Sequence, residues 1–148
     1  MTNSNNETKA KRVAIVANTS HKTHLIEWAF LNKDILRKLD ISANGKTALV
    51  LEGTLSVPVT ELASRTLGGY RDLVKMISKG QIDILFILNY DQISEKRQKQ
   101  ISELLQVAME SDIIIAPNQA TAEIVLKSLE AEVKNDRSDD HNHLTAVV

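Results

Sequence analysis

The chain has 148 residues, of which 43% are hydrophobic and 25% are charged, which is typical of one soluble globular domain. Its 18 Lys and Arg residues nearly balance 19 Asp and Glu residues, so the formal net charge is -1 and no overall field attracts it to nucleic acid or to an anionic membrane. The absence of cysteine excludes disulfides, a thiolate nucleophile and sulfur-ligated metal sites. Aromatic residues make up only 3%, which argues against base-stacking surfaces. No apolar stretch approaches the ~20 residues that span a bilayer, and the polar N-terminus lacks a signal-peptide core, so a cytoplasmic location is expected.

The first half of the chain alternates strand and helix patterns. Residues 1–10 are polar and are predicted to be disordered, ahead of one domain over residues 11–134. The run Arg12–Ala17 is apolar at nearly every position, which predicts a strand covered on both faces. The following patterns predict a helix over 21–39, a short strand over 41–43, a short helix over 48–52 closed by Gly53, and an edge strand over 55–62.

The second half continues the alternation, and strands alternating with helices predict an α/β fold: a three-layer, mostly parallel sheet flanked by helices. Asp83 is expected to close a turn near Gly80. Residues 135–148 are expected to be a flexible tail; His141 and His143 could chelate a metal with Asp139 and Asp140, but a flexible acidic tail is the favoured interpretation. The patterns predict a loop over 64–69, a helix over 71–79 ended by Gly80, a buried strand over 82–88, a helix over 94–111, a strand over 113–116 and a last helix over 120–134.

Ligands of parallel α/β sheets bind outside the carboxyl ends of the strands, so the loops at that edge are the candidate functional segments. The loop Asn44-Gly45-Lys46-Thr47 precedes a predicted helix, where free N–H groups, a hydroxyl and a lysine can bind an oxyanion. It is not a Walker A loop, because the first glycine and its spacing are missing. A plain capped turn is the competing interpretation. The other loops at this edge are 18–22, 64–70, 89–91 and 117–121.

Residues Lys11 to about Leu129 resemble methylglyoxal synthase, the lyase that eliminates phosphate from dihydroxyacetone phosphate. The matching residues stand in order, at constant spacing and without an insertion. The same type of domain occurs as the regulatory domain of carbamoyl-phosphate synthetase and in a bifunctional purine-synthesis enzyme. The resemblance implies a Rossmann-like topology and a homo-oligomer, a hexamer with pockets near subunit interfaces. It rests on Val13–Ala17 with Lys22 and Trp28, Ala43-x-Gly45-x-Thr47, Ser64 with Gly68-Gly69, Ile77-Ser78-x-Gly80-x-Ile82-Asp83, and Asn118-x-Ala120-Thr121-Ala122.

The resemblance further implies a phosphate pocket. Lys22, Thr47 and Ser64 match the family pattern, whereas Asn44 and Lys46 stand where the family has threonines. Arg65 stands where the family has glycine. These changes keep hydrogen-bond donors and add two cations, so the pocket is expected to accept more negative charge than one monoester carries. The expected phosphate-binding residues are Asn18, Lys22, Asn44, Gly45, Lys46, Thr47, Ser64, Arg65, Gly68 and Gly69.

The positions that the family uses for acid–base chemistry all differ. The principal base, an aspartate after the glycine pair, is Tyr70 here, and a tyrosine of ordinary pKa near 10 is a poor proton acceptor. A helping aspartate is replaced by Tyr90, with Asp91 next to it. The family's histidine in the following loop is Arg97, which could add a cation if that segment folds over the pocket. The remaining family positions fall on Asn18-Thr19 and Gln100, and His21 lies three residues beyond an expected histidine.

These residues support one leading hypothesis and two alternatives. The leading one is a methylglyoxal-synthase-like protein that binds a phosphorylated small molecule or nucleotide but is impaired in lyase chemistry, and so acts as a binding or regulatory module. The first alternative is an active synthase that uses Asp91 or His21, and the second is an interaction protein with a relic pocket. No cofactor and no metal are expected.

Overall fold

The computed structural model describes residues 10–18, 22–62, 68–90 and 92–142, and within these ranges it leaves out the side chains of residues 68–69 and 136–142. A five-stranded sheet in the order β3-β2-β1-β4-β5 forms its centre, and every pairing between neighbouring strands is parallel. This confirms the predicted α/β fold. The strands are β1 (Arg12–Asn18), β2 (Asp40–Asn44), β3 (Thr60–Leu62), β4 (Ile84–Asn89) and β5 (Ile114–Ala116).

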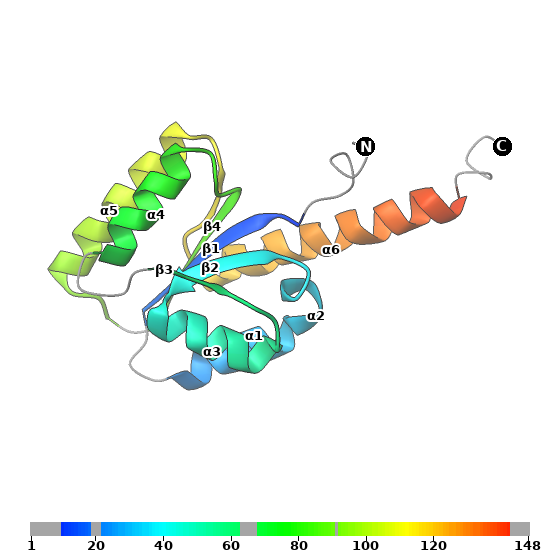
Figure 1. The fold of residues 1–148 in the computed structure, drawn as a ribbon, viewed down its shortest axis with the longest axis horizontal. Coiled ribbons are helices and arrows are strands. Elements are labelled where there is room, and N and C mark those ends of the chain that lie inside the picture. The colour runs from blue at the N-terminus through cyan, green and yellow to red at the C-terminus, as the bar shows by residue number, and fades with distance from the viewer. Residues whose placement is uncertain (1–9, 19–21, 63–67, 91, 143–148) are drawn as a thin grey trace.

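Helices cover both faces of the sheet, which explains why its strands are apolar at successive positions. Side chains alternate along β1, so that Val13 and Ile15 join one buried cluster while Ala14 and Val16 join the other. Figure 1 shows α4 and α5 on one side of the sheet and α1 and α3 on the other. The helices are α1 (Lys22–Leu31), α2 (Lys33–Leu36), α3 (Gly45–Leu55), α4 (Gly68–Ser78), α5 (Glu95–Glu110) and α6 (Gln119–Asn142).

Two helix ends match their sequence signals. Ser94 precedes α5, and its hydroxyl accepts a hydrogen bond from the Arg97 amide at 3.2 Å, as expected of an N-cap. Gly80 follows α4 with a φ of +73°, the left-handed conformation that favours glycine at a helix end. The predicted end of α4 and the predicted start of α5 are thus each found within one residue.

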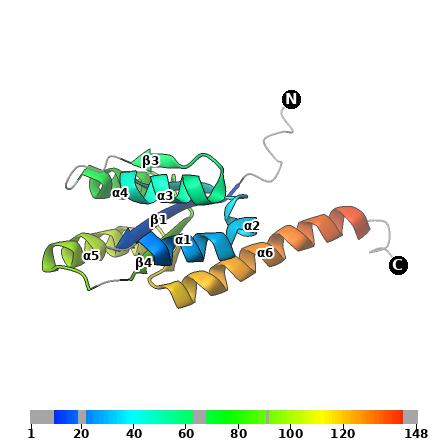
Figure 2. The same cartoon turned by 90° about the horizontal axis from the view of Figure 1, so that it is seen from below.

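Several predicted helix boundaries are wrong. The expected helix over 21–39 is divided at Asn32, whose side chain donates to the Trp28 carbonyl at 2.9 Å and to Glu123 at 3.2 Å. Helix α3 begins at Gly45 and continues through Gly53 to a left-handed Ser56 with φ 56°, so the following strand shortens to β3. Helix α6 continues to Asn142, well into the expected tail, and its end extends beyond the rest of the domain (Figure 2).

Asp83 does not close a turn near Gly80. Its carboxylate accepts hydrogen bonds from the Arg12 backbone amide at 2.8 Å and from the guanidinium of the same residue at 2.9 and 3.1 Å. The hydrogen bond to Arg12 lowers the pKa of Asp83. Asp83 therefore connects the start of β4 to the start of β1.

Among the residues that the structure describes, no helix is long and apolar enough to cross a membrane.

Candidate functional site

A cavity of about 280 Å³ lies at the carboxyl edge of the sheet, where β1 and β2 end. Ala17, Leu25 and Val50 supply its apolar wall. Asn18 and Asn44, the last residues of the two strands, line it together with Thr47. Its volume is close to the lower end of the ~300–1,000 Å³ range of small-molecule sites. Asn18 and Lys22, the described ends of the predicted loop 18–22, therefore line the same hollow as residues of the loop 44–47.

The turn into α3 has the geometry of a capped helix start. Asn44 is extended, with φ -72° and ψ 166°, and its side-chain oxygen accepts a hydrogen bond from the Thr47 amide at 3.3 Å. This is the capped turn that the sequence left as the competing interpretation. The cap satisfies one N–H group of the first turn. The N–H groups of Gly45 and Lys46 belong to the same turn, and N–H groups in the first turn of a helix have no acceptor within the helix. The turn thus combines a cap with an N-terminus that favours an anion.

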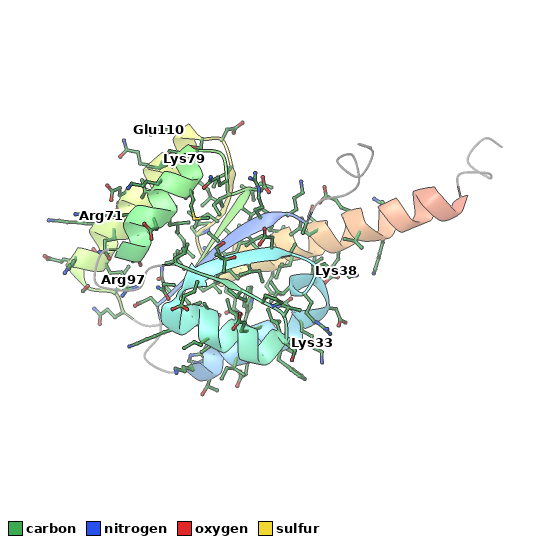
Figure 3. All side chains as sticks on the ribbon, viewed as in Figure 1. Lys33, Lys38, Arg71, Lys79, Arg97 and Glu110 are labelled. Atoms are coloured by element: carbon green, nitrogen blue, oxygen red, sulfur yellow. The ribbon has the colours of Figure 1, made fainter. Side chains whose placement is uncertain are left out.

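Three cations line the cavity, and no acidic residue does so within the described part of the chain. Lys22 is the first residue of α1 and is exposed, as is Lys46 in the first turn of α3. Arg97 lies in the first turn of α5 and is half-buried. Figure 3 shows Arg97 at the end of the α4–α5 layer that is nearer to the start of α3. Arg97 is the one residue of α5 among the described lining residues of the cavity.

Tyr70 and Arg97 form a contact at this edge. The Arg97 Nη1 atom donates to the Tyr70 hydroxyl oxygen at 3.0 Å, and the guanidinium carbon lies 5.7 Å from the centre of the ring. Tyr70 is 9% exposed, and burial raises its pKa above the ordinary value of 10.0, although the Arg97 charge and hydrogen bond oppose the shift. The tyrosine is therefore a neutral phenol at physiological pH and accepts no proton there.

Tyr90 takes no part in the lining of the cavity. Its ring stacks on His24, with centroids 5.3 Å apart and planes inclined by 22°. Burial raises the pKa of Tyr90 to about 12, and the Glu123 charge adds to the shift. The hydroxyl oxygen is buried and has no hydrogen-bond partner among the described residues. Tyr90 thus packs against His24 of α1 and against the core cluster that α1 helps to form.

Four of the predicted site residues lie outside the part of the chain that the structure describes: Ser64, Arg65, Asp91 and His21. Gly68 and Gly69 are the first residues of α4 and not part of a loop. In the part of the chain with described side chains, no group of three potential metal ligands is found, and His141 and His143 are not included in that part.

The sequence left the place of Arg97 conditional and did not predict its bond to Tyr70. One signal was available: the resemblance places both residues at positions of a single site, so a contact between them could have been inferred. The stacking of His24 on Tyr90 had no such signal. Helix α1 places His24 against a strand end that lies far along the sequence.

The fold and the cavity define a class of protein, namely a three-layer parallel α/β domain with a cationic hollow at the carboxyl edge of its sheet. No family model matches the chain. Individual relatives do match. The methylglyoxal synthase of Thermoanaerobacterium thermosaccharolyticum is 30% identical over 119 residues, which cover 80% of this chain and 89% of that protein. The methylglyoxal synthase of Coxiella burnetii (strain RSA 493 / Nine Mile phase I) is 32% identical over 118 residues, covering 80% and 82%.

A solved structure agrees with these relatives. The crystal structure of methylglyoxal synthase from Elizabethkingia anophelis NUHP1 matches with a TM-score of 0.65 and 26% identity, over 80% of this chain and 78% of that one. The chain therefore belongs to the methylglyoxal synthase family.

Proposed function

We propose that the protein binds a phosphorylated small molecule in the cavity at the carboxyl edge and serves as a binding or regulatory module with impaired lyase chemistry. The observation that carries this proposal is the charge of the lining: Lys22, Lys46 and Arg97 face the hollow without an acidic residue among the described lining residues. A phosphate monoester carries a charge of about -1.5 to -2 at neutral pH, which complements such a lining. The helix starts that hold Lys22 and Lys46 add N–H groups and the positive end of a helix dipole.

The surroundings of Arg97 disfavour catalysis. Elimination of phosphate from dihydroxyacetone phosphate begins with removal of a proton beside a carbonyl, which needs a base in its ionised form. At the position where the resemblance expects that base, Tyr70 is a buried phenol bonded to Arg97. Loss of one general base costs roughly 10²–10⁴ in rate. Arg97 stands where the resemblance expects a histidine, and this second replacement should lower the rate further.

An active methylglyoxal synthase is the second candidate, and the relatives favour it. The curated proteins that match 80% of this chain carry that name. In this case the base is Asp91 or His21, which both lie outside the described residues. Binding of phosphate is common to both candidates, so turnover distinguishes them.

The deciding experiment measures release of methylglyoxal and phosphate from dihydroxyacetone phosphate at high protein concentration, with the Coxiella burnetii enzyme as the active control. We expect no turnover above background, together with a rise in melting temperature when inorganic phosphate is added. Turnover within about a hundredfold of the control would instead establish the synthase. A melting temperature that does not respond to any phosphorylated compound would remove the binding proposal.

We further propose that the protein is a homo-oligomer, a hexamer by resemblance to its family. Large apolar side chains are exposed on neighbouring helices: Phe30 and Leu31 on α1 are 58% and 80% exposed, and Leu49 on α3 is 67% exposed. Exposed apolar side chains on two helices that contact each other suit a surface that is buried on assembly. Light scattering coupled to size-exclusion chromatography measures the mass in solution, and a monomer at all concentrations would contradict the proposal.

A further inference from the structure

The cations of the cavity come from two different layers of the fold. Lys22 and Lys46 stand at the starts of α1 and α3, whose buried side chains belong to one core cluster. Arg97 stands near the start of α5, whose buried side chains belong to the cluster on the opposite face of the sheet. The lining of the cavity therefore combines two lysines from one layer with an arginine from the other.

Arg97 is positioned more firmly than the lysines. Lys22 and Lys46 are exposed, whereas Arg97 is half-buried and its Nη1 atom donates to the hydroxyl of the buried Tyr70 at 3.0 Å. A guanidinium has five N–H donors in a planar arrangement. A hydrogen bond that fixes this plane prepares the remaining donors for two-point binding of a carboxylate or phosphate. Tyr70 thus acts as a positioning residue for Arg97.

The charge and size of the cavity both exceed what one phosphate group needs. The three cationic side chains carry more charge than the -1.5 to -2 of a monoester at about pH 7. The volume of about 280 Å³ corresponds to roughly nine water molecules at ~30 Å³ each. A phosphate group of five heavy atoms leaves much of that space, and the Arg97 side of it, unfilled.

From this arrangement we propose that the ligand carries two anionic groups, a phosphate held by Lys22 and Lys46 and a second anion, a carboxylate or phosphate, held by Arg97 in the plane set by Tyr70. The ligand class is that of small phosphorylated acids and bisphosphates. This inference rests on the proposed binding function and adds the number and placement of the charges.

The test compares probes that differ in the second anion. Isothermal titration calorimetry of the full chain with inorganic phosphate, glycerol 3-phosphate and 3-phosphoglycerate measures the gain from an added carboxylate. We expect 3-phosphoglycerate to bind about tenfold more tightly than glycerol 3-phosphate, as one charge-assisted bidentate contact provides. Fructose 1,6-bisphosphate, compared with fructose 6-phosphate, tests a second phosphate in the same way.

Variants assign that preference to one residue. Arg97→Gln should weaken 3-phosphoglycerate binding about tenfold more than glycerol 3-phosphate binding and so bring the ratio of the two affinities to about one, whereas Lys46→Gln should weaken both probes alike. Arg97→Lys keeps the charge without the planar donors and should restore only part of the preference. Tyr70→Phe removes the acceptor that orients Arg97 and should reduce the preference about threefold with the charge intact. Arg37→Gln, an exposed arginine at the C-terminal end of α2, is the matched control and should change neither affinity.

The outcomes separate the two proposals. If no phosphorylated probe binds, the binding function fails and this inference fails with it. If glycerol 3-phosphate binds and 3-phosphoglycerate binds no better, the proposed function stands and the two-anion ligand is wrong. An unchanged preference in Arg97→Gln would likewise overturn the assignment of the second subsite to Arg97.

Discussion

Two hollows at opposite edges of the sheet collect charged residues in different ways. At the amino edge, where β1 and β4 begin, Lys11 and Arg12 line a hollow with Asp40 and Asp83. Arg12 and Asp83 form an ion pair at 2.9 Å, and this hydrogen-bonded contact raises the pKa of Arg12 and lowers that of Asp83. The cations of this edge therefore have their counter-charges within the protein.

The carboxyl edge shows the opposite arrangement. Lys22, Lys46 and Arg97 share a cavity whose described lining contains no carboxylate, and the hydrogen-bond partner of Arg97 is the neutral hydroxyl of Tyr70. The strand β1 contributes to both edges, with Arg12 at its start and Asn18 at its end. The difference lies in which described residues follow the strands, and the proposed anionic ligand would supply the counter-charge of the carboxyl edge.

The largest effect should follow from removing the lysines. We expect the double variant Lys22→Ala/Lys46→Ala to lose roughly 10²–10⁴ in affinity for glycerol 3-phosphate, since hydrogen bonds to charged groups contribute about 1.5–3 kcal/mol each. Both side chains are exposed, so the melting temperature without ligand should not change. Calorimetric titration measures the affinity. The double variant Lys38→Ala/Lys79→Ala removes the same charge at the exposed positions labelled in Figure 3, and equal affinities in the two variants would place the site elsewhere.

Placing a carboxylate beside Arg97 should make the carboxyl edge resemble the amino edge. In Tyr70→Asp the new side chain can pair with Arg97, as Asp83 pairs with Arg12. We expect the affinity for 3-phosphoglycerate to fall by about tenfold, because the protein then supplies part of the counter-charge. Turnover of dihydroxyacetone phosphate should stay at background, because other family acid–base positions remain replaced. Robust turnover in this single variant would show that those positions are not required.

The layers of this fold follow from sequence periodicity because they depend on local information. The apolar run of β1 and the terminal Gly80 each act within a few residues and are found as predicted, and the Ser94 cap is a local feature of the same kind. The break of the first helix at Asn32 is different. It is accompanied by a hydrogen bond to Glu123, 91 residues away in sequence, and no local pattern encodes that partner.

The candidate site also combines a part that local sequence encodes with a part that depends on how distant segments pack. The loop that follows β2 combines a cap, a lysine and a threonine in four consecutive residues, so its chemistry could be predicted from the sequence. The approach of Arg97 depends on how α5 packs on the opposite face, and its bond to Tyr70 joins residues 27 positions apart. Periodicity places Arg97 on a helix and Tyr70 just before one, but it does not say which partner each residue contacts.

Tyr90 tests how far the ligand region extends along the carboxyl edge. Its hydroxyl is buried and has no hydrogen-bond partner in the described part of the chain, so Tyr90→Phe should leave the fold unchanged and stabilise it by about 1 kcal/mol, the lower end of the cost of an unsatisfied buried group. Binding of phosphorylated probes should be unchanged, because Tyr90 packs on His24 outside the cavity lining. Urea unfolding and calorimetric titration measure the two quantities. A loss of affinity in this variant would extend the site to the end of β4.

The smallest effect should come from the amino edge. Asp83→Asn removes the ion pair with Arg12 but keeps an acceptor for the Arg12 amide, and the paired side chains are 43% and 36% exposed, so the loss of stability should be only about 0.5 kcal/mol near pH 7. The folded state lowers the pKa of Asp83 below its ordinary value of 3.8, so the contribution is complete above that value and is lost as the pH falls through the lowered pKa. Urea unfolding at a series of pH values should therefore show the two proteins converging in strong acid. Unlike the variants of the carboxyl edge, Asp83→Asn should bind every phosphorylated probe with the affinity of the unchanged protein, because the hollow at the amino edge already contains its own counter-charge. A loss of affinity in Asp83→Asn would mean that the two edges are coupled through β1.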